Sequence, residues 1–416
     1  MDILSDTYPE KLWGRHQLVE QIIWQLQDND CRLLNLCGPV GMGKTRIAVE
    51  LVADERLKQH FAAGMVAMTL KGKQGNLCQL IAEKLEHPHL NTWPQLADLI
   101  ASQNYLIVLD AFEDRIDEDA ENLEQLLDSC PKLVILITSQ EVLNVDSEYC
   151  LRLEGLSLPQ GAEMFKSLLI PAQDQAKPLK EEAAELSQLE MESIVHLLEG
   201  WPLGIVMAAE QARDYRLSEV YSQLSQGFAW LERKNPASPQ HQSARSAFES
   251  MWQRLSWHEQ RLFRQLAIFG HSFSYEGAES ILDIPVIALD RLVDMSLLRF
   301  AQDERYYLHP MIHSFIAEKL RLRVEEKRQL ERIHAEYYYA FADLIEDNLS
   351  NEDSKNWLDE LLNERENLLI ALEWAKFHKH WPMVKSLKAC LQRLRQRQAN
   401  QTNLIDLLSP ATFLGS

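Results

Sequence analysis

One eight-residue segment constrains the fold of this chain more than any other feature, Gly38-Pro39-Val40-Gly41-Met42-Gly43-Lys44-Thr45. This Gly-x-x-x-x-Gly-Lys-Thr pattern follows an apolar run and opens an amphipathic stretch, the strand, loop and helix order of a phosphate-binding loop. Glycines let successive backbone N–H groups point at phosphate oxygens, and the helix that begins there adds its positive end. Lys44 would bridge the β- and γ-phosphates and Thr45 would supply a hydroxyl to Mg²⁺. A chance glycine loop is the weaker interpretation, because four fixed positions occur in the right setting.

Short apolar runs alternate with helical patterns over the first part of the chain. The helical patterns include residues 44–53, 76–85, 94–100 and 120–127. The apolar runs cover residues 32–37, 65–70, 105–109, 133–137 and 149–153. Continuous apolar strands separated by helices predict a parallel sheet that is covered on both faces. We therefore expect a layered α/β nucleotide-binding domain over residues 1–158.

Two of these runs end in polar groups that suit the same chemistry. The run 105–109 is followed by Asp110, in the form of a Walker B element, and this carboxylate would hold Mg²⁺ through its water shell. The alternative is an acid that only caps a strand. The run 133–137 ends in Thr138-Ser139-Gln140, where a phosphate sensor would lie; a plain core strand is an equal alternative.

Helical patterns replace the strands after residue 158. Residues 159–240 predict a helical subdomain, interrupted by a polar stretch at 171–190 and closed by a Pro-rich linker at 234–240. Residues 241–325 predict helices at 244–254, 258–267 and 287–295, followed by a hairpin with a polar turn at 302–304. That is the layout of a winged helix. Residues 326–416 predict a helical, TPR-like C-terminal module.

Charge and composition narrow the range of partners. The net charge of −20 disfavours a general affinity for nucleic acid or anionic lipid. Residues 245–325 hold acids and bases in near balance, so DNA binding is not expected there. No apolar run is long enough to span a membrane, and the N-terminus lacks the layout of a signal peptide. Six widely spaced cysteines favour free thiols. We expect a cytoplasmic protein without membrane contact.

Further segments, taken with the phosphate-binding loop and Asp110, resemble the STAND class of P-loop ATPases, in the NB-ARC (AP-ATPase) group and its bacterial regulator-like form. Leu12-Trp13-Gly14-Arg15 resembles the element before the loop that contacts adenine. Gly200-Trp201-Pro202-Leu203 resembles the GLPL motif. Leu308-His309-Pro310 resembles the MHD motif in its bacterial spelling. The motifs stand in the family order over roughly three quarters of the chain.

The resemblance implies a sheet of order 5-1-4-3-2 and a nucleotide-controlled switch. ADP would hold a closed form, and ATP would promote an open form that associates with itself or with a protein partner. The implied roles are hydrolysis for Lys44 and Asp110, Mg²⁺ binding for Thr45 and Asp110, and a hydrogen bond to the ADP β-phosphate for His309. Helix capping is the alternative for His309. The implied nucleotide-binding residues are Trp13, Gly14, Arg15, Gly38, Pro39, Val40, Gly41, Met42, Gly43, Lys44, Thr45, Arg46, Pro202 and His309.

Two departures from the family pattern concern the γ-phosphate. Ala111 stands where an acid usually follows the Walker B aspartate, and Gln140 stands where the family often has arginine. Glu113, Asp114, Arg115 or Arg152 could take over the roles of the missing acid and arginine. We therefore expect at most slow hydrolysis, and the rivals to a switch are a steadily turning-over ATPase, a winged-helix transcription regulator and a scaffold that binds nucleotide without switching.

Overall fold

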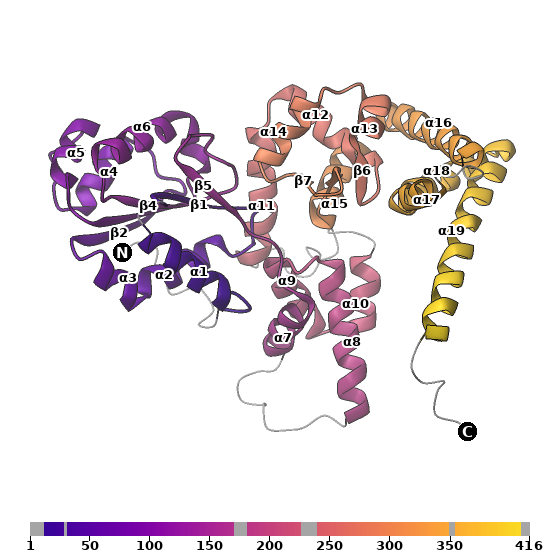
Figure 1. Ribbon diagram of the computed structural model, residues 1–416, viewed down its shortest axis with the longest axis horizontal. Helices are drawn as coiled ribbons and strands as arrows, with labels where there is room; N and C mark the ends of the chain where they lie inside the picture. Colours follow the sequence, from indigo (N-terminus) through magenta and orange to yellow (C-terminus); the bar gives the residue numbers. More distant parts are fainter. Residues whose placement is uncertain (1–11, 29–30, 170–180, 226–238, 349–353, 409–416) are drawn as a thin grey trace. The chain divides into compact units, whose positions relative to one another are not determined.

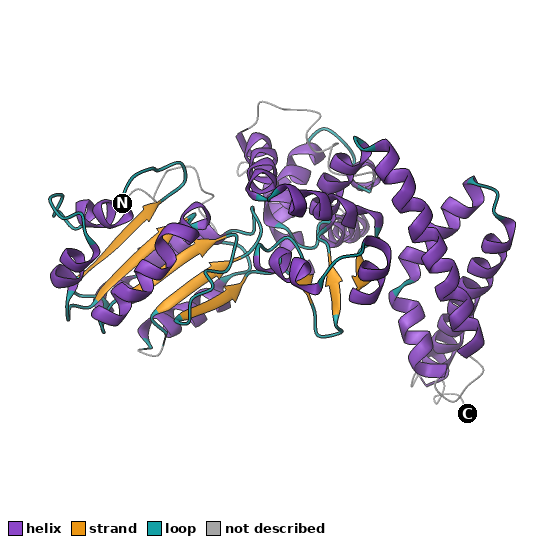
Figure 2. Ribbon diagram, turned by 90° about the horizontal axis from the view of Figure 1, so that it is seen from above, coloured by secondary structure: helices purple, strands orange, loops and turns teal. Residues whose placement is uncertain are grey.

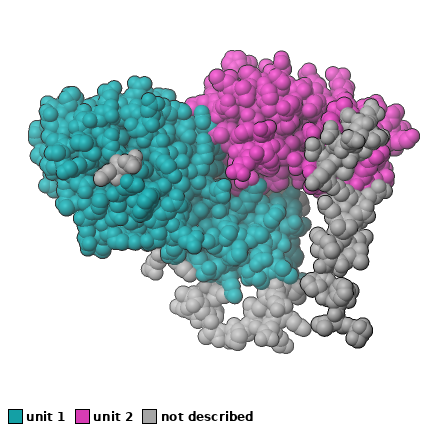
Figure 3. Space-filling model, in the orientation of Figure 1, with its two compact units in different colours: residues 1–250, 294–296 teal, residues 251–293, 297–416 magenta. Residues whose placement is uncertain are grey.

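The computed structural model describes residues 12–28, 31–169, 181–225, 239–348 and 354–408. The chain divides into two compact units, which Figure 3 colours separately. The first unit contains residues 1–250 and 294–296, and the second contains residues 251–293 and 297–416. The predicted division into four domains is finer than these units and remains a prediction.

A five-stranded parallel sheet forms the centre of the first unit. Its strand order is β2-β3-β4-β1-β5, which is the predicted order 5-1-4-3-2 read from the opposite edge. The predicted α/β fold class is therefore confirmed, and each strand begins and ends within two residues of its apolar run. The strands are β1 (Leu33–Cys37), β2 (Gly64–Thr69), β3 (Tyr105–Asp110), β4 (Val134–Ser139) and β5 (Glu148–Arg152).

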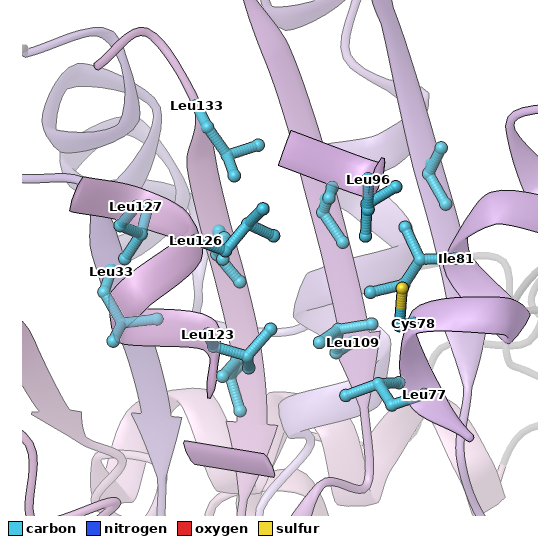
Figure 4. Close-up of a cluster of buried hydrophobic side chains, with 14 of the residues drawn as sticks. Leu33, Leu77, Cys78, Ile81, Leu96, Leu109, Leu123, Leu126, Leu127 and Leu133 are labelled. Atoms are coloured by element: carbon cyan, nitrogen blue, oxygen red, sulfur yellow. The ribbon is translucent and has the colours of Figure 1, made fainter. Parts of the chain in front are cut away.

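Helices cover both faces of this sheet, as Figures 1 and 2 show. One face of the sheet packs against the apolar sides of the helices within residues 77–129. Figure 4 shows this core, with Leu33 on the side of Leu123 and Leu127, and Leu109 on the side of Leu77 and Cys78. Every residue of β1 and β4 is buried, as expected for strands between two helical layers. The helices on one face are α1 (His16–Gln27), α2 (Lys44–Ala53) and α3 (Glu55–His60), and those on the other are α4 (Leu77–Lys84), α5 (Trp93–Ile100) and α6 (Ile116–Ser129).

The rest of the first unit is helical. It contains α7 (Leu158–Leu169), α8 (Glu181–Leu197), α9 (Pro202–Ala212), α10 (Leu217–Leu224) and the greater part of α11 (Pro239–Arg254). The predicted interruption over 171–190 is wrong for its second half, because α8 begins at Glu181 and its Glu-, Ala- and Leu-rich start consists of good helix formers. Most of the predicted linker lies outside the described residues. Its end, Pro239, is instead the first residue of α11, where proline is well accommodated.

Two backbone segments cross closely between the sheet and these helices. The Leu156 N–H donates to the Gly200 carbonyl at 2.8 Å. A Cβ atom on Gly200 would lie 2.0 Å from the Leu156 carbonyl oxygen, and one on Gly155 would lie 1.9 Å from the Glu199 carbonyl oxygen. Gly200 also has a φ of +67°, in the left-handed region that favours glycine. Only glycine fits this crossing at positions 155 and 200.

The second unit begins with short helices around a small antiparallel sheet of order β6-β8-β7. The predicted hairpin is present as β7 and β8, whereas β6 and α13 were not expected. The elements are α12 (Trp257–Gln265), β6 (Ser272–Ser274), α13 (Tyr275–Leu282), α14 (Val286–Asp294), β7 (Arg299–Phe300), β8 (Arg305–Tyr307) and α15 (Pro310–Arg321). The helical stretch that follows contains α16 (Val324–Asn348), α17 (Ser354–Asn363), α18 (Arg365–Phe377) and α19 (Trp381–Leu408).

A buried polar network joins the small sheet to these long helices. Arg305 of β8 forms an ion pair with Glu364 at 2.6 Å, and both side chains are at most 6% exposed. Tyr338 and Asn367 donate to the second oxygen of the same carboxylate, each at 2.7 Å. Because every oxygen of this buried carboxylate has a partner, the charge is compensated where water is excluded.

No helix in the described part of the chain has the length and apolar character needed to cross a membrane.

Candidate nucleotide-binding site

The phosphate-binding loop lies between the end of β1 and the start of α2. Helix α2 begins at Lys44, as predicted, and Gly43 precedes it with a φ of +92°. No atom lies within 4 Å of the position where a Cβ on Gly43 would be, so the loop leaves open space there. The N–H groups in the first turn of a helix have no partners within the helix. They are available to an anion together with the positive end of the helix dipole.

The Lys44 side chain turns back over this loop. Its Nζ donates to the Pro39 carbonyl at 2.9 Å and to the Gly38 carbonyl at 2.5 Å. Burial lowers the pKa of Lys44, and the nearby Glu113, Cys37 and Asp110 oppose that shift. A buried ammonium held by neutral carbonyls and facing two carboxylates is suited to receive a polyanion.

Asp110 at the end of β3 is the centre of a small hydrogen-bond network. Thr45 and Thr138 both donate to its Oδ1, each at 2.7 Å. The Ala111 N–H donates to the Thr138 hydroxyl at 3.0 Å. The structure thus brings together the two predicted Mg²⁺ ligands, Thr45 and Asp110, and their oxygen atoms are the type that Mg²⁺ prefers. The part of the chain that the structure describes contains no group of three or more His, Cys, Asp or Glu that could hold a metal ion.

A cavity of about 640 Å³ opens in front of the loop, within the range of small-molecule sites. The predicted site residues that line it are Trp13, Arg15, Val40, Gly41, Met42, Gly43, Lys44, Thr45, Arg46, Asp110 and Pro202. Gly38 and Pro39 contribute the carbonyls that hold Lys44, and Gly14 lies between two lining residues. His309 belongs to the second unit. Within the first unit, therefore, the structure gathers predicted residues from four segments that are distant in the sequence.

The segment before the loop is fixed by its own contacts. The Arg15 guanidinium donates to the Glu154 carbonyl at 2.5 Å, and burial lowers its pKa. Gly14 has a φ of +61°, and a Cβ there would lie 2.7 Å from the Gln160 side chain. Trp13 and Arg15 both line the cavity next to these contacts.

One side of the cavity is lined by Gln140 and by two of the residues expected to substitute for the missing family groups. Gln140 donates from Nε2 to the Glu113 carboxylate, and both residues line the cavity together with Asp114. Arg115 instead donates to the Gly75 and Lys73 carbonyls. The Nη2 atom of Arg152 lies 4.0 Å from Oδ1 of Asp294. Four residues were expected to take over the roles of the missing family groups. Of these, Glu113 and Asp114 line the cavity, and Arg115 and Arg152 do not.

Sequence reasoning missed several lining residues. Thr69 is the last residue of β2 and Lys71 lies just after it, and the rule that ligands bind beyond the carboxyl ends of parallel strands could have identified them. Met164, Val206 and Ser250 come from three different helices, and no local pattern marks them. Met164 and Val206 add apolar surface to the cavity.

His309 caps helix α15. Its Nδ1 accepts a hydrogen bond from the Met311 N–H at 3.2 Å. A ring nitrogen that accepts a hydrogen bond carries no proton, so only Nε2 of His309 can donate while this contact is made. The capping alternative is what the structure describes, and the phosphate contact remains a prediction.

The sheet order, the loop and the aspartate together define a P-loop nucleotide-binding domain. Comparison with known families matches residues 15–174 to the NB-ARC domain. This segment belongs to that family, which confirms the resemblance of the chain to STAND-class P-loop ATPases. At the level of the class, the match supports a nucleotide-dependent switch that binds its nucleotide with Mg²⁺.

Individual relatives are more distant. A Mycobacterium tuberculosis protein named as an HTH-type transcriptional regulator is 28% identical over 376 residues, which cover 87% of this chain and 42% of that protein. A protein of Arabidopsis thaliana named for disease resistance is 27% identical over 146 residues, covering 35% of this chain and 22% of its own length. The STAND protein with a tetratricopeptide repeat sensor from Pyrococcus horikoshii has 17% identity and a TM-score of 0.38, over 95% of this chain and 54% of that structure. This chain spans less than half the length of the mycobacterial regulator.

Proposed function

We propose that this chain is a signalling switch controlled by ADP and ATP. The observation that carries the proposal is the arrangement around Lys44, Thr45 and Asp110, where a cation, a hydroxyl and a carboxylate face one cavity. In the proposed cycle, ADP holds a closed form, and exchange for ATP promotes an open form that associates with itself or a partner. Such a switch needs only different contacts to the two nucleotides in the two forms.

The proposed roles of the chain's residues follow from their chemistry. Backbone N–H groups of the loop and the Lys44 ammonium bind and orient the phosphates. Thr45 and Asp110 hold Mg²⁺, which neutralises phosphate charge when it is bound. Trp13, Arg15 and Pro202 form the wall for the base and ribose. With Ala111 and Gln140 on the γ-phosphate side, hydrolysis is proposed to be slow.

The test is nucleotide binding by the purified chain and by Lys44→Ala. We expect the wild type to bind ADP and ATP, and the variant to lose at least tenfold in affinity, because the removed charge-assisted contact contributes about 1.5–3 kcal/mol. Lys58→Ala is the matched control, since Lys58 pairs with Glu55 at the exposed end of α3. Light scattering with ADP and with a non-hydrolysable ATP analogue then tests association. Wild-type affinity in Lys44→Ala would refute the placement of the phosphate site.

A second candidate is a transcription regulator, as the name of the mycobacterial relative suggests. Residues 245–325 contain ten Lys and Arg against eleven Asp and Glu, so this region offers no surplus of the basic side chains that position a module on phosphates. We therefore favour the switch. Salt-sensitive, sub-micromolar binding of this chain to duplex DNA would reverse that choice.

A further inference from the structure

Trp201 reaches from the start of α9 to the phosphate-binding loop. Its side chain is fully buried, with 1% exposure, and its indole Nε1 donates to the Val40 carbonyl at 2.9 Å. Val40 is the residue before Gly41, at the point where the loop turns toward its phosphate-facing N–H groups. The GLPL motif that this segment resembles has leucine at this position, and a leucine side chain has no N–H to donate.

A second hydrogen bond joins the same two segments. The Leu203 N–H, in the first turn of α9, donates to the Gly41 carbonyl at 3.3 Å. First-turn N–H groups need a partner outside their helix, and here the loop supplies it. The fit is close, since a Cβ on Gly41 would lie 2.7 Å from Trp201 Nε1 and 2.6 Å from Leu203 Cβ. Two consecutive loop carbonyls are thus tied to α9.

The indole itself is fixed from the other side. A Cβ on Gly204 would lie 2.4 Å from its Cε3 atom, so the ring lies directly on the α9 backbone. The Phe248 ring of α11 packs on it with centroids 5.9 Å apart. Because helices on both sides hold the ring, its N–H presents one fixed position to the Val40 carbonyl rather than following the loop.

We propose that Trp201 is a positioning residue for nucleotide binding, which holds the Val40 carbonyl so that the N–H groups after it face the phosphates. The inference rests on the proposed function, because it concerns the same site. Losing the N–H leaves a buried carbonyl without its donor and frees the loop to rotate. We expect nucleotide affinity to fall about tenfold, mainly through faster dissociation.

Two replacements remove the N–H while retaining the aromatic ring. Trp201→Phe keeps an aromatic ring against Phe248 and Gly204. A benzothienyl-alanine introduced at position 201 keeps the shape of the indole and replaces only the N–H by sulfur. The matched control is Trp252→Phe, because Trp252 belongs to the second unit and stacks there on Phe263.

The readouts are the dissociation constants and rates of fluorescent ADP and ATP analogues, and amide exchange over residues 40–45 without nucleotide. We expect faster dissociation and faster exchange in the loop for both position-201 variants, with unchanged exchange in β1 and β4, and wild-type binding for Trp252→Phe. Wild-type dissociation and loop exchange in the benzothienyl variant would overturn the role of Trp201. Absence of nucleotide binding by the wild type would instead overturn the proposed function.

Discussion

Glu113 and Gln140 form a hydrogen-bonded pair on the side of the cavity where we expect the γ-phosphate. Gln140 follows the last residue of β4, and its neutral amide donates to the Glu113 carboxylate. An arginine or another cation at this point stabilises the charge that develops in phosphoryl transfer. This chain has the Glu113 carboxylate and the Gln140 amide at that point. Lys44 therefore supplies a cation at the loop, but position 140 does not supply a second cation.

Gln140→Arg should therefore accelerate hydrolysis. The wild type is expected to turn over well below the roughly 1–100 s⁻¹ of kinases. An arginine at position 140 can pair with Glu113 and reach the γ-phosphate, so we expect at least about a tenfold increase, a small part of the 10³–10⁵ that a well-placed arginine provides. Steady-state phosphate release measures the rate.

Gln140→Ala is the control for this substitution. It removes the contact to Glu113 without adding a cation, so its turnover should not exceed that of the wild type. An equal increase in both variants would mean that releasing Glu113, rather than adding positive charge, controls the rate. Wild-type turnover of several per second would itself contradict the expectation of slow hydrolysis.

Site residues could be predicted where their chemistry is continuous in the sequence. The loop from Gly38 to Thr45 combines spacing, a preceding strand and a following helix, and Asp110 ends an unbroken apolar run. Met164 and Ser250 carry no such local signal, because only tertiary packing brings them to the cavity. The indole contact of Trp201 was missed for the same reason: its partner, Val40, is far away in the sequence.

At the level of elements, the strands were easier to predict than the small helices. Buried parallel strands such as β1 and β4 are apolar throughout, so their sequence pattern has sharp ends. Strand β6 has only three residues, too few to show alternation, and α13 contains Gly277 early in its sequence. Both therefore lack a periodic signal and form through contacts with β8 and the helices around them.

The start of α15 offers a test that separates the two roles of His309. His309→Ala removes the cap on the Met311 N–H and should lower the free energy of unfolding by about 1 kcal/mol, whereas asparagine, a strong capping residue, should restore most of it. Chemical denaturation of both variants measures this difference.

ADP release from the same two variants tests the proposed phosphate contact. If His309 also donates to ADP, both variants should release ADP faster than the wild type, because neither retains an Nε2–H at that reach. Unchanged release in a stable His309→Asn protein would assign the residue to capping alone. Faster release only in His309→Ala would attribute the effect to the helix end.

For the whole molecule, acid stability depends on a histidine inside the second unit. His334 of α16 is fully buried between the rings of Phe269 and Tyr338, and burial lowers its pKa to about 3. Its unfolded pKa is about 6.5. Between these values the unfolded chain binds the extra proton, so stability is lost as the pH falls through this window.

His334→Gln should reduce this loss. Between pH 7 and pH 5 the wild type should lose about 2 kcal/mol more than the variant, from the proton bound by the unfolded state. The carboxylates that titrate in the same range are common to both proteins and cancel in the comparison. Denaturant unfolding at the two pH values measures the difference, and the exposed His258→Gln serves as the control. Parallel pH dependence in all three proteins would show that His334 is accessible to protons when folded.

The close crossing at Gly155 and Gly200 limits how related sequences can diverge. A Cβ atom at position 155 or 200 would lie 1.9 Å or 2.0 Å from a main-chain carbonyl oxygen. Because every residue type has this oxygen, a second substitution cannot remove the clash. Gly204 differs, because the atom nearest to its missing Cβ belongs to the Trp201 ring. Homologues should therefore keep glycine at 155 and 200 regardless of their neighbours, while alanine becomes acceptable at 204 wherever 201 carries a smaller residue. An alignment of homologues would reveal this as two invariant columns and one covarying pair.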